Sequence, residues 1–209
     1  ADSDVPVTEL SANVNRYGNY GVSVDRSQAL VESGAVRGRV VASYQDGDTF
    51  IDRQELGQNL IYATVDADVS DSTTISVGAS RQHNKSKSTM WGGLPNYLSD
   101  GSKADWDTSK NGSANWSNWD SDNTYYFADI THDFNEDWNL TTKASYNESD
   151  SSPKLLYLFG GPLNVDTGLG LGFNVFHADT ERKQTNIKTE LTGNFDALGR
   201  THKLIVGGS

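Results

Sequence analysis

Strict alternation of apolar and polar side chains along residues 61–69 is the strongest constraint on the fold of this chain. The apolar set is Ile61, Ala63, Val65, Ala67 and Val69, and the residues between them are Tyr62, Thr64, Asp66 and Asp68. Successive side chains of a β-strand point to opposite faces, whereas a helix repeats every 3.6 residues. The segment is therefore predicted to be a strand with one apolar face and one polar face.

The same period of two recurs along the chain and predicts nine strands. The other eight carry their apolar positions within residues 10–14, 20–24, 36–44, 75–79, 126–134, 138–146 and 187–195, and from Lys203 onward. No segment has a convincing helical period; the nearest, 52–60, is short and contains Gly57. Only 35% of the residues are hydrophobic, although 10% are aromatic. This composition fits an antiparallel sheet that is apolar on one face and wet on the other.

The lengths of the predicted connections indicate how such a sheet is placed. Short links fall at 29–35, 70–72, 135–137 and 196–201, and long links at 46–56, 84–123 and 150–181. Short turns at one end and long loops at the other are typical of an outer-membrane β-barrel, with the turns in the periplasm and the loops outside. The expected fold class is all-β, an antiparallel up-and-down transmembrane β-barrel. Charged residues of the polar face, such as Arg37 and Asp68, would then line a wet interior.

Aromatic residues of the apolar face fall into two groups under this topology. Tyr20, Tyr44, Tyr126 and Tyr146 lie at the loop ends of their strands, and Phe134, Trp138 and Phe195 lie at the opposite ends. Membrane-spanning sheets place aromatic girdles at both water interfaces. The two groups of aromatic residues therefore support the prediction that this face of the sheet contacts a lipid bilayer.

Composition and motifs exclude several function classes. The net charge of −11 opposes binding to nucleic acid, and the absence of cysteine removes disulfides and thiolate sites. Asp105, Asp107, Asp120 and Asp122 could bind a hard cation, but they lack the spacing of a calcium loop, and a solvated acidic loop is the simpler interpretation. The four histidines are scattered. We predict no metal site and no enzyme, because no nucleophile elbow, phosphate loop or anchored carboxylate pair is present.

Four stretches resemble one protein family. They are Val36–Asp46 with Phe50–Arg53, then Trp91–Pro95 with Ser99–Gly101, then Lys154–Leu158, and finally Gly199–Leu204. In this order and spacing the chain is similar to TonB-dependent ferric-siderophore receptors, especially the hydroxamate group that includes the coprogen and pyoverdine receptors. In that family a barrel of about 22 strands encloses an N-terminal plug.

The resemblance implies that residues 1–209 are the N-terminal part of such a barrel. The plug and the C-terminal strands are expected to be absent from the chain, and 46–56, 84–123 and 150–181 to be long extracellular loops. The implied function is binding and import of a ferric siderophore of the hydroxamate type at the outer membrane of a Gram-negative bacterium. The implied partners are the siderophore, outer-membrane lipid and TonB–ExbB–ExbD, the last through the missing N-terminal region. Iron would enter only as the chelate, with no resident cofactor.

The candidate ligand-binding residues are aromatic and lie in the long links. They are Trp91, Tyr97, Trp106 and Trp116 in the second loop and Tyr157 in the third. Rigid rings with a polar edge suit a compact polar chelate, although rings in loops also pack the loop itself. Trp91 is favoured as a ligand contact because it sits near a strand end within the family-like Trp-Gly-Gly-Leu-Pro; for Tyr157 binding and packing remain equally open.

Two other functions remain open from the sequence. A soluble β-rich carbohydrate-binding or adhesion module would use the same Trp and Tyr rings to stack on sugars. A passive porin would need an open channel without a plug. We also expect that these residues do not fold alone, because edge strands and an apolar face would be exposed.

Overall fold

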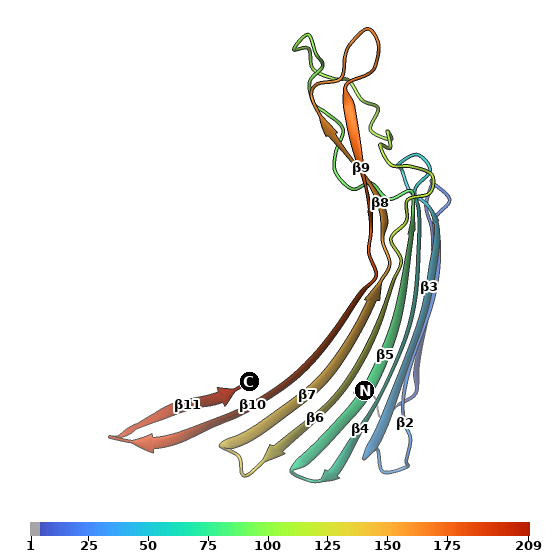
Figure 1. Cartoon of the computed structure of the whole chain (residues 1–209). Helices are drawn as coiled ribbons and strands as arrows, with labels where there is room; N and C mark the ends of the chain where they lie inside the picture. Colours follow the sequence, from blue (N-terminus) through green and yellow to red (C-terminus); the bar gives the residue numbers. More distant parts are fainter. Residues whose placement is uncertain (1–4) are drawn as a thin grey trace.

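Nine strands of the chain form one antiparallel sheet in a computed structural model that describes residues 5–209 (Figure 1). The strands are β1 (Val7–Val14), β2 (Tyr20–Ala29), β3 (Val36–Asp48), β4 (Glu55–Ser70), β5 (Thr73–Lys87), β6 (Ser121–Asp133), β7 (Trp138–Ser151), β10 (Thr180–Ala197) and β11 (Arg200–Gly208). Each strand in this series is hydrogen-bonded to the one that follows it, and β10 pairs directly with β7 although β8 and β9 lie between them in the sequence. The nine predicted strands are confirmed.

Two further strands were not predicted. β8 (Lys154–Gly160) and β9 (Leu171–His177) pair with each other in a separate hairpin between β7 and β10. Figure 1 shows this hairpin standing beyond the end of the large sheet. None of the described residues belongs to a helix that is long and apolar enough to cross a membrane.

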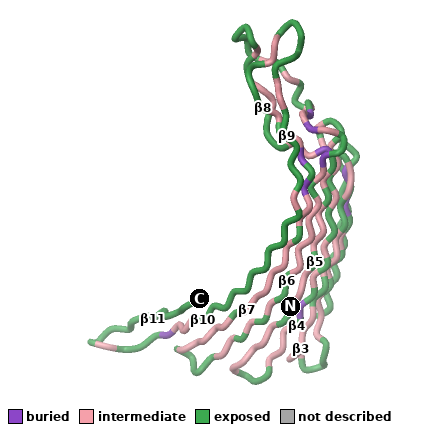
Figure 2. The backbone as a smooth tube through the Cα atoms, viewed as in Figure 1, coloured by how far each residue is buried: buried purple, intermediate pink, exposed green. Residues whose placement is uncertain are grey.

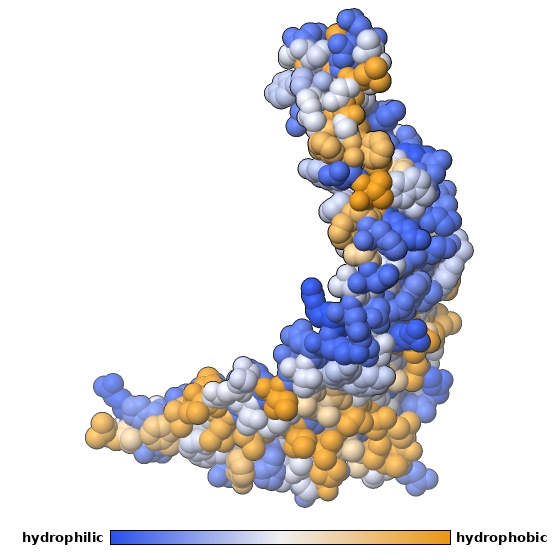
Figure 3. Space-filling model, viewed as in Figure 1, coloured by the Kyte–Doolittle hydropathy of each residue, from blue (hydrophilic) through white to orange (hydrophobic). Residues whose placement is uncertain are grey.

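The register places small and branched apolar residues in rows across one face of the sheet. Val65 of β4 lies opposite Val77 of β5, which lies opposite Ala128 of β6. Ala128 in turn lies opposite Ala144 of β7, and Ala144 opposite Ile187 of β10. Figure 3 shows hydrophobic side chains gathered over the lower part of the molecule, toward the short turns. No second layer covers this face in the described structure, as expected for a sheet whose apolar side meets lipid.

The opposite face carries ion pairs between neighbouring strands. The guanidinium of Arg37 on β3 donates to both carboxylate oxygens of Asp68 on β4, at 2.6 and 3.0 Å. Arg39 likewise donates to both oxygens of Asp25 on β2, at 2.9 and 2.5 Å. These pairs agree with the prediction that this face is the wet interior, where charges are tolerated.

Connections collect at two ends of the sheet, which we call the turn end and the loop end. The turn end holds residues 30–35, 71–72, 134–137 and 198–199, and the loop end holds 15–19, 49–54, 88–120 and 152–179. The strands extend further than the alternating apolar residues indicated, so the three long links begin later and end earlier than predicted. Two loop-end connections, 15–19 and 49–54, are short, so loop length alternates less regularly than the sequence suggested.

Buried residues lie mainly where the sheet meets the loops (Figure 2). Among the described residues Leu155 of β8 is the one buried hydrophobic side chain, and Ser88, Asn111, Ser113 and Ser117 are buried polar ones. The packed core of the described residues is therefore within the two long connections at the loop end, and the sheet itself is a single layer.

Candidate functional site: the loop cluster above the sheet

The two longest connections are joined to each other at the loop end. The backbone N–H of Asn118, near the end of the 88–120 loop, donates to the carbonyl of Lys154 at 2.8 Å, and the N–H of Lys154 donates back at 2.9 Å. Further out, the N–H of Ser99 donates to the carbonyl of Leu163 at 2.9 Å. The β8–β9 hairpin and the 88–120 loop thus form one unit, which we call the loop cluster.

Three aromatic rings meet in the loop cluster. The Trp91 ring lies edge-on to Tyr157 of β8, with ring centroids 5.6 Å apart and planes at 64°. It also lies 5.0 Å from the ring of Phe176 on β9. The edge-to-face contact between Trp91 and Tyr157 is favourable because the positive ring edge meets the negative ring face. Trp91 and Tyr157 are 37% and 42% exposed, so both keep an open surface.

The backbone beside Trp91 needs a glycine. Gly92 has φ of +103°, and a Cβ built there would lie 2.8 Å from Cε2 of Tyr157. A residue with a side chain would be strained at this φ and would displace the Tyr157 ring. The family-like Gly92 therefore allows Trp91 and Tyr157 to lie in contact.

Apolar side chains support the three rings from the hairpin. Leu155, which is opposite Phe176 in the hairpin register, is fully buried. A small cavity between Met90, Gly112, Leu156 and Leu158 holds almost no free volume, so the loop is packed tightly against β8. The Trp91–Tyr157–Phe176 group is consequently a supported platform, and we call it the aromatic platform.

The other three predicted ligand contacts lie elsewhere in the loop. Tyr97 is 62% exposed and its backbone bridges to Lys103 in an outer turn. The Trp106 indole N–H donates to the carbonyl of Pro95 at 2.8 Å, and Trp116 is exposed. Within residues 5–209 no ring contact joins these three to the aromatic platform. The structure therefore brings together Trp91 and Tyr157 from the predicted set and leaves Tyr97, Trp106 and Trp116 apart.

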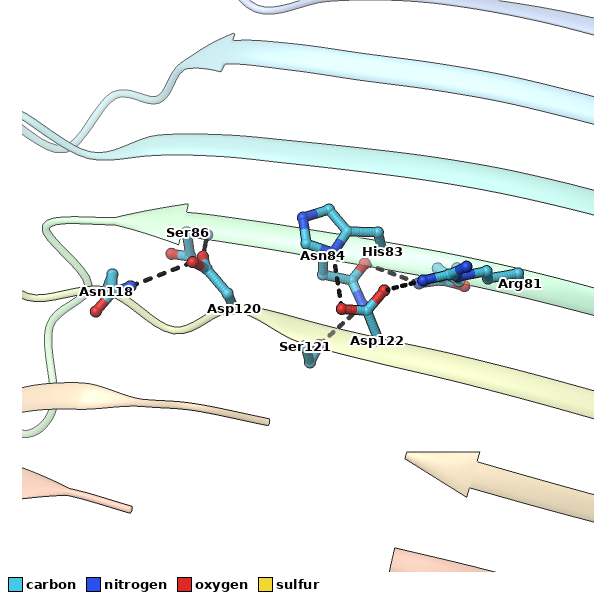
Figure 4. A network of polar contacts seen from close by, with 9 residues as sticks. Arg81, His83, Asn84, Ser86, Asn118, Asp120, Ser121 and Asp122 are labelled. Carbon is cyan, nitrogen blue, oxygen red and sulfur yellow. Dashed lines mark hydrogen bonds and ion pairs between the residues drawn. The ribbon is translucent and has the colours of Figure 1, made fainter. Parts of the chain in front are cut away.

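Polar contacts between β5 and β6 fix the base of the 88–120 loop (Figure 4). The Asp122 carboxylate lies 3.2 Å from Nδ1 of His83 and 3.5 Å from the guanidinium of Arg81. Asp120 accepts from the side-chain amide of Asn118 at 3.2 Å and from the backbone N–H of Ser86 at 3.4 Å. These two acidic residues thus hold the loop stem on the sheet.

Two other loop carboxylates close tight turns. Asp100 accepts from the hydroxyl and the backbone N–H of Ser102, at 2.6 and 2.9 Å, and these bonds lower the pKa of Asp100. The backbone N–H of Ser109 does the same for Asp107, at 2.8 Å, and lowers the pKa of that carboxyl. Across the described chain no three His, Asp or Glu side chains gather closely enough to hold a metal ion.

Sequence reasoning missed Phe176 and the role of Leu155, because both belong to a hairpin that it did not predict. The signal was present in the run Leu155-Leu156-Tyr157-Leu158-Phe159, but a continuous apolar run has no period and can be strand or buried loop.

Comparison with known proteins gives a consistent match along the chain. The chain is 33% identical over 192 residues to the ferripyoverdine receptor of Pseudomonas aeruginosa, covering 91% of this chain and 23% of the receptor. It is 30% identical over 205 residues to the ferric-pyoverdine M114 receptor of a Pseudomonas species, covering 98% of this chain and 24% of that protein. The chain thus spans about a quarter of the length of these curated relatives. No protein-family model matches it.

Solved structures agree with the sequence matches. The crystal structure of the ferripyoverdine receptor of the P. aeruginosa outer membrane, bound to ferripyoverdine, superposes with a TM-score of 0.89 at 30% identity. That match covers 98% of this chain and 27% of the receptor chain. The ferric-catecholate import receptor Fiu of Escherichia coli superposes with a TM-score of 0.84 at 14% identity, which shows a shared fold only.

Proposed function

We propose that this chain, as part of the barrel of a TonB-dependent ferric-siderophore receptor, forms one side of the site that captures the chelate at the bacterial outer surface. The matched proteins are receptors rather than enzymes. They are named as receptors for ferric pyoverdines, and they match this chain over more than nine-tenths of its length. The loop end of the sheet would face outward and the turn end would face the periplasm.

The aromatic platform is the observation that carries this proposal. Trp91, Tyr157 and Phe176 come from three separate segments and meet at the loop end of a sheet whose apolar face suits lipid. A ferric siderophore is a compact polar chelate, and flat half-exposed rings bind such a ligand with little loss of side-chain entropy. Tyr97, Trp106 and Trp116 would then contribute at the rim, where they keep exposed or hydrogen-bonded edges.

Transport would follow from the whole receptor. Iron would enter only as the siderophore chelate, and a hydroxamate-type chelate such as ferripyoverdine is the proposed cargo. Energy would come from TonB–ExbB–ExbD acting on the N-terminal region of the receptor, and residues 1–209 would form the N-terminal part of the barrel. The soluble carbohydrate-binding module and the passive porin are not favoured, because the matched proteins are siderophore receptors.

Equilibrium binding of ferripyoverdine to the full-length protein in outer-membrane vesicles tests the proposal. We expect saturable binding, and we expect the double variant Trp91→Ala with Tyr157→Ala to weaken it at least tenfold, since two aromatic contacts are lost. Trp119→Ala is the matched control: this Trp is also half-exposed, but its indole N–H donates to the Ser151 hydroxyl at 2.9 Å, away from the platform.

Uptake of radioactive iron from the same chelate by intact cells extends the test. Uptake should depend on TonB and fall with the double variant. Equal binding by wild type and the double variant would remove the aromatic platform from the site, and no binding by wild type would reject ferripyoverdine as the cargo.

A further inference from the structure

The 49–54 connection between β3 and β4 touches the 88–120 loop through Arg53. The Arg53 guanidinium donates to the carbonyl of Asn111 at 3.0 Å and to the carbonyl of Ser113 at 2.9 Å. It also donates to the side-chain oxygen of Asn115. The Arg53 side chain therefore binds every second residue of the long loop from 111 to 115.

Asn111 of the 88–120 loop in turn donates hydrogen bonds, one of them to the 49–54 connection. Its side-chain amide donates to the carbonyl of Asp52 at 2.7 Å and to the carbonyl of Ser88 at 2.9 Å, and its oxygen accepts from the N–H of Ser113 at 2.8 Å. The N–H of Asp52 donates to the carbonyl of Ser109 at 2.8 Å. Asn111 is only 7% exposed, so these bonds are shielded from competing water.

Arg53 is held in an unusual backbone conformation at this contact. Its φ is +66°, a region that residues other than glycine and asparagine seldom occupy. Such a conformation persists only where surrounding contacts determine it. The 49–54 connection is therefore shaped so that the guanidinium reaches the loop.

The segment bound by Arg53 leads directly to the aromatic platform. Gly112 lies between the two carbonyl acceptors, and its N–H is 3.3 Å from the sulfur of Met90, the residue before Trp91. A Cβ at Gly112 would lie 3.1 Å from Leu94 and 3.2 Å from Leu158 of β8. Gly112 thus contacts Met90, the residue before Trp91, and lines the same small cavity as Met90 and Trp91.

We propose that Arg53 is a positioning residue that holds residues 109–115 against the 49–54 connection and thereby fixes the Trp91 side of the ligand site. This inference rests on the proposed function, since it assigns Arg53 a role in the same site. Arg53 acts through the loop, because its guanidinium donates to acceptors of Asn111, Ser113 and Asn115. Its planar fork can donate to several oxygens at once, whereas a lysine ammonium is a single point of charge, so lysine is not an adequate replacement.

The test uses the full-length protein in detergent or membrane vesicles, with variants Arg53→Ala and Arg53→Lys. Hydrogen–deuterium exchange should become at least tenfold faster in residues 109–117 in both variants, while exchange in β4 to β7 stays unchanged. The dissociation constant for ferripyoverdine should rise at least tenfold in both. Arg182→Ala, which removes an exposed arginine near the loop end of β10, should change neither quantity.

The outcomes separate this inference from the proposed function. Unchanged exchange in both Arg53 variants would overturn the inference, whatever the dissociation constant for ferripyoverdine. Faster exchange with unchanged affinity would also overturn it, because the loop would move without consequence for the site. A wild-type protein that binds no ferripyoverdine would contradict the proposed cargo, and the hold on the loop would then be judged by exchange alone. Wild-type exchange and affinity in Arg53→Lys would overturn the assignment to the guanidinium, because a single ammonium group would then be sufficient.

Discussion

At the scale of single residues, the aromatic platform depends on a position without a side chain. Gly92 combines φ of +103° with a ring 2.8 Å from the place of its missing Cβ. Gly93 follows it immediately, has no atom within 4 Å of its own missing Cβ and carries no left-handed φ. A methyl group at Gly92 would therefore disturb the aromatic platform, whereas a methyl group at Gly93 would add the same atoms to the loop without touching the platform.

Gly92→Ala is predicted to weaken ferripyoverdine binding roughly tenfold. A Cβ at this φ costs on the order of 1–2 kcal/mol, and the free loop would relieve that strain by leaving the conformation that holds Trp91 against Tyr157. The added methyl group would also push Tyr157 away from Trp91. Gly93→Ala should bind as wild type does. Titration of both variants with the chelate measures the difference, and equal affinities would mean that the ring contact does not matter for binding.

Acid should open the turn at Asp100. Its pKa is lowered by the two bonds from Ser102, so the carboxylate form is favoured in the folded loop. A lowered pKa contributes stability above the ordinary value near 3.8, and that contribution is lost as pH falls through the lowered value. We expect exchange at the Ser102 amide, corrected for its intrinsic rate, to accelerate below pH 4. Asp100→Asn should be insensitive to pH over that range, and a wild-type turn that is equally insensitive would contradict the assignment.

At the scale of elements, two strand pairs of the large sheet set a glycine opposite an aromatic residue. Gly78 of β5 faces Phe127 of β6, and Gly193 of β10 faces Trp138 of β7. A Cβ at Gly78 would lie 2.5 Å from the Phe127 ring and 2.8 Å from the carbonyl of Ala63. At Gly193 it would lie 2.2 Å from the Trp138 ring. Each ring covers the bare backbone of its partner, a device known to support glycines in sheets.

Gly78→Ala and Gly193→Ala are each predicted to destabilise the full-length barrel by about 1–3 kcal/mol, the usual cost of overpacking. Gly161→Ala in the 152–179 connection is the control, because nothing lies within 4 Å of that position and its φ is not left-handed. Urea unfolding in lipid vesicles, followed by the heat-dependent shift in electrophoretic mobility, gives the comparison. Stabilities equal to the control would show that the rings move aside without cost.

The nine strands of the large sheet could be predicted because each has one apolar face, so its period is visible. The β8–β9 hairpin could not, because β8 packs Leu156 and Leu158 against the 88–120 loop while Leu155 is buried on its other side. Because apolar residues stand on both faces of β8, the run has no alternation. Trp91 and Tyr157 could be chosen as candidates from their residue type and from the motifs around them. The roles of Phe176 and Arg53 could not be predicted, because they depend on contacts between segments that are distant in the sequence.

At the scale of the whole molecule, the described sheet is open. β1 and β11 are its two edges, and the apolar face includes exposed Ile61 and Ile187. Unpaired strand edges and a wide apolar face favour association with other chains or with lipid.

Residues 1–209 produced alone are therefore predicted to aggregate in buffer and to need detergent or lipid. Sedimentation velocity with limited proteolysis tests this expectation. A monodisperse, protease-resistant species in plain buffer would contradict it, and the same residues within the full-length protein should resist protease after membrane insertion.

The length of β10 has a mechanical consequence. Its 18 residues extend about 60 Å at roughly 3.3 Å per residue. Even tilted by about 45°, the strand is taller than the apolar band of about 25 Å that an outer-membrane barrel presents to lipid. The sheet therefore continues above the hydrocarbon as a stiff pedestal. The aromatic platform would then stand clear of the lipid headgroups, at a height where the proposed chelate, or a much larger molecule, could reach it from the surrounding medium.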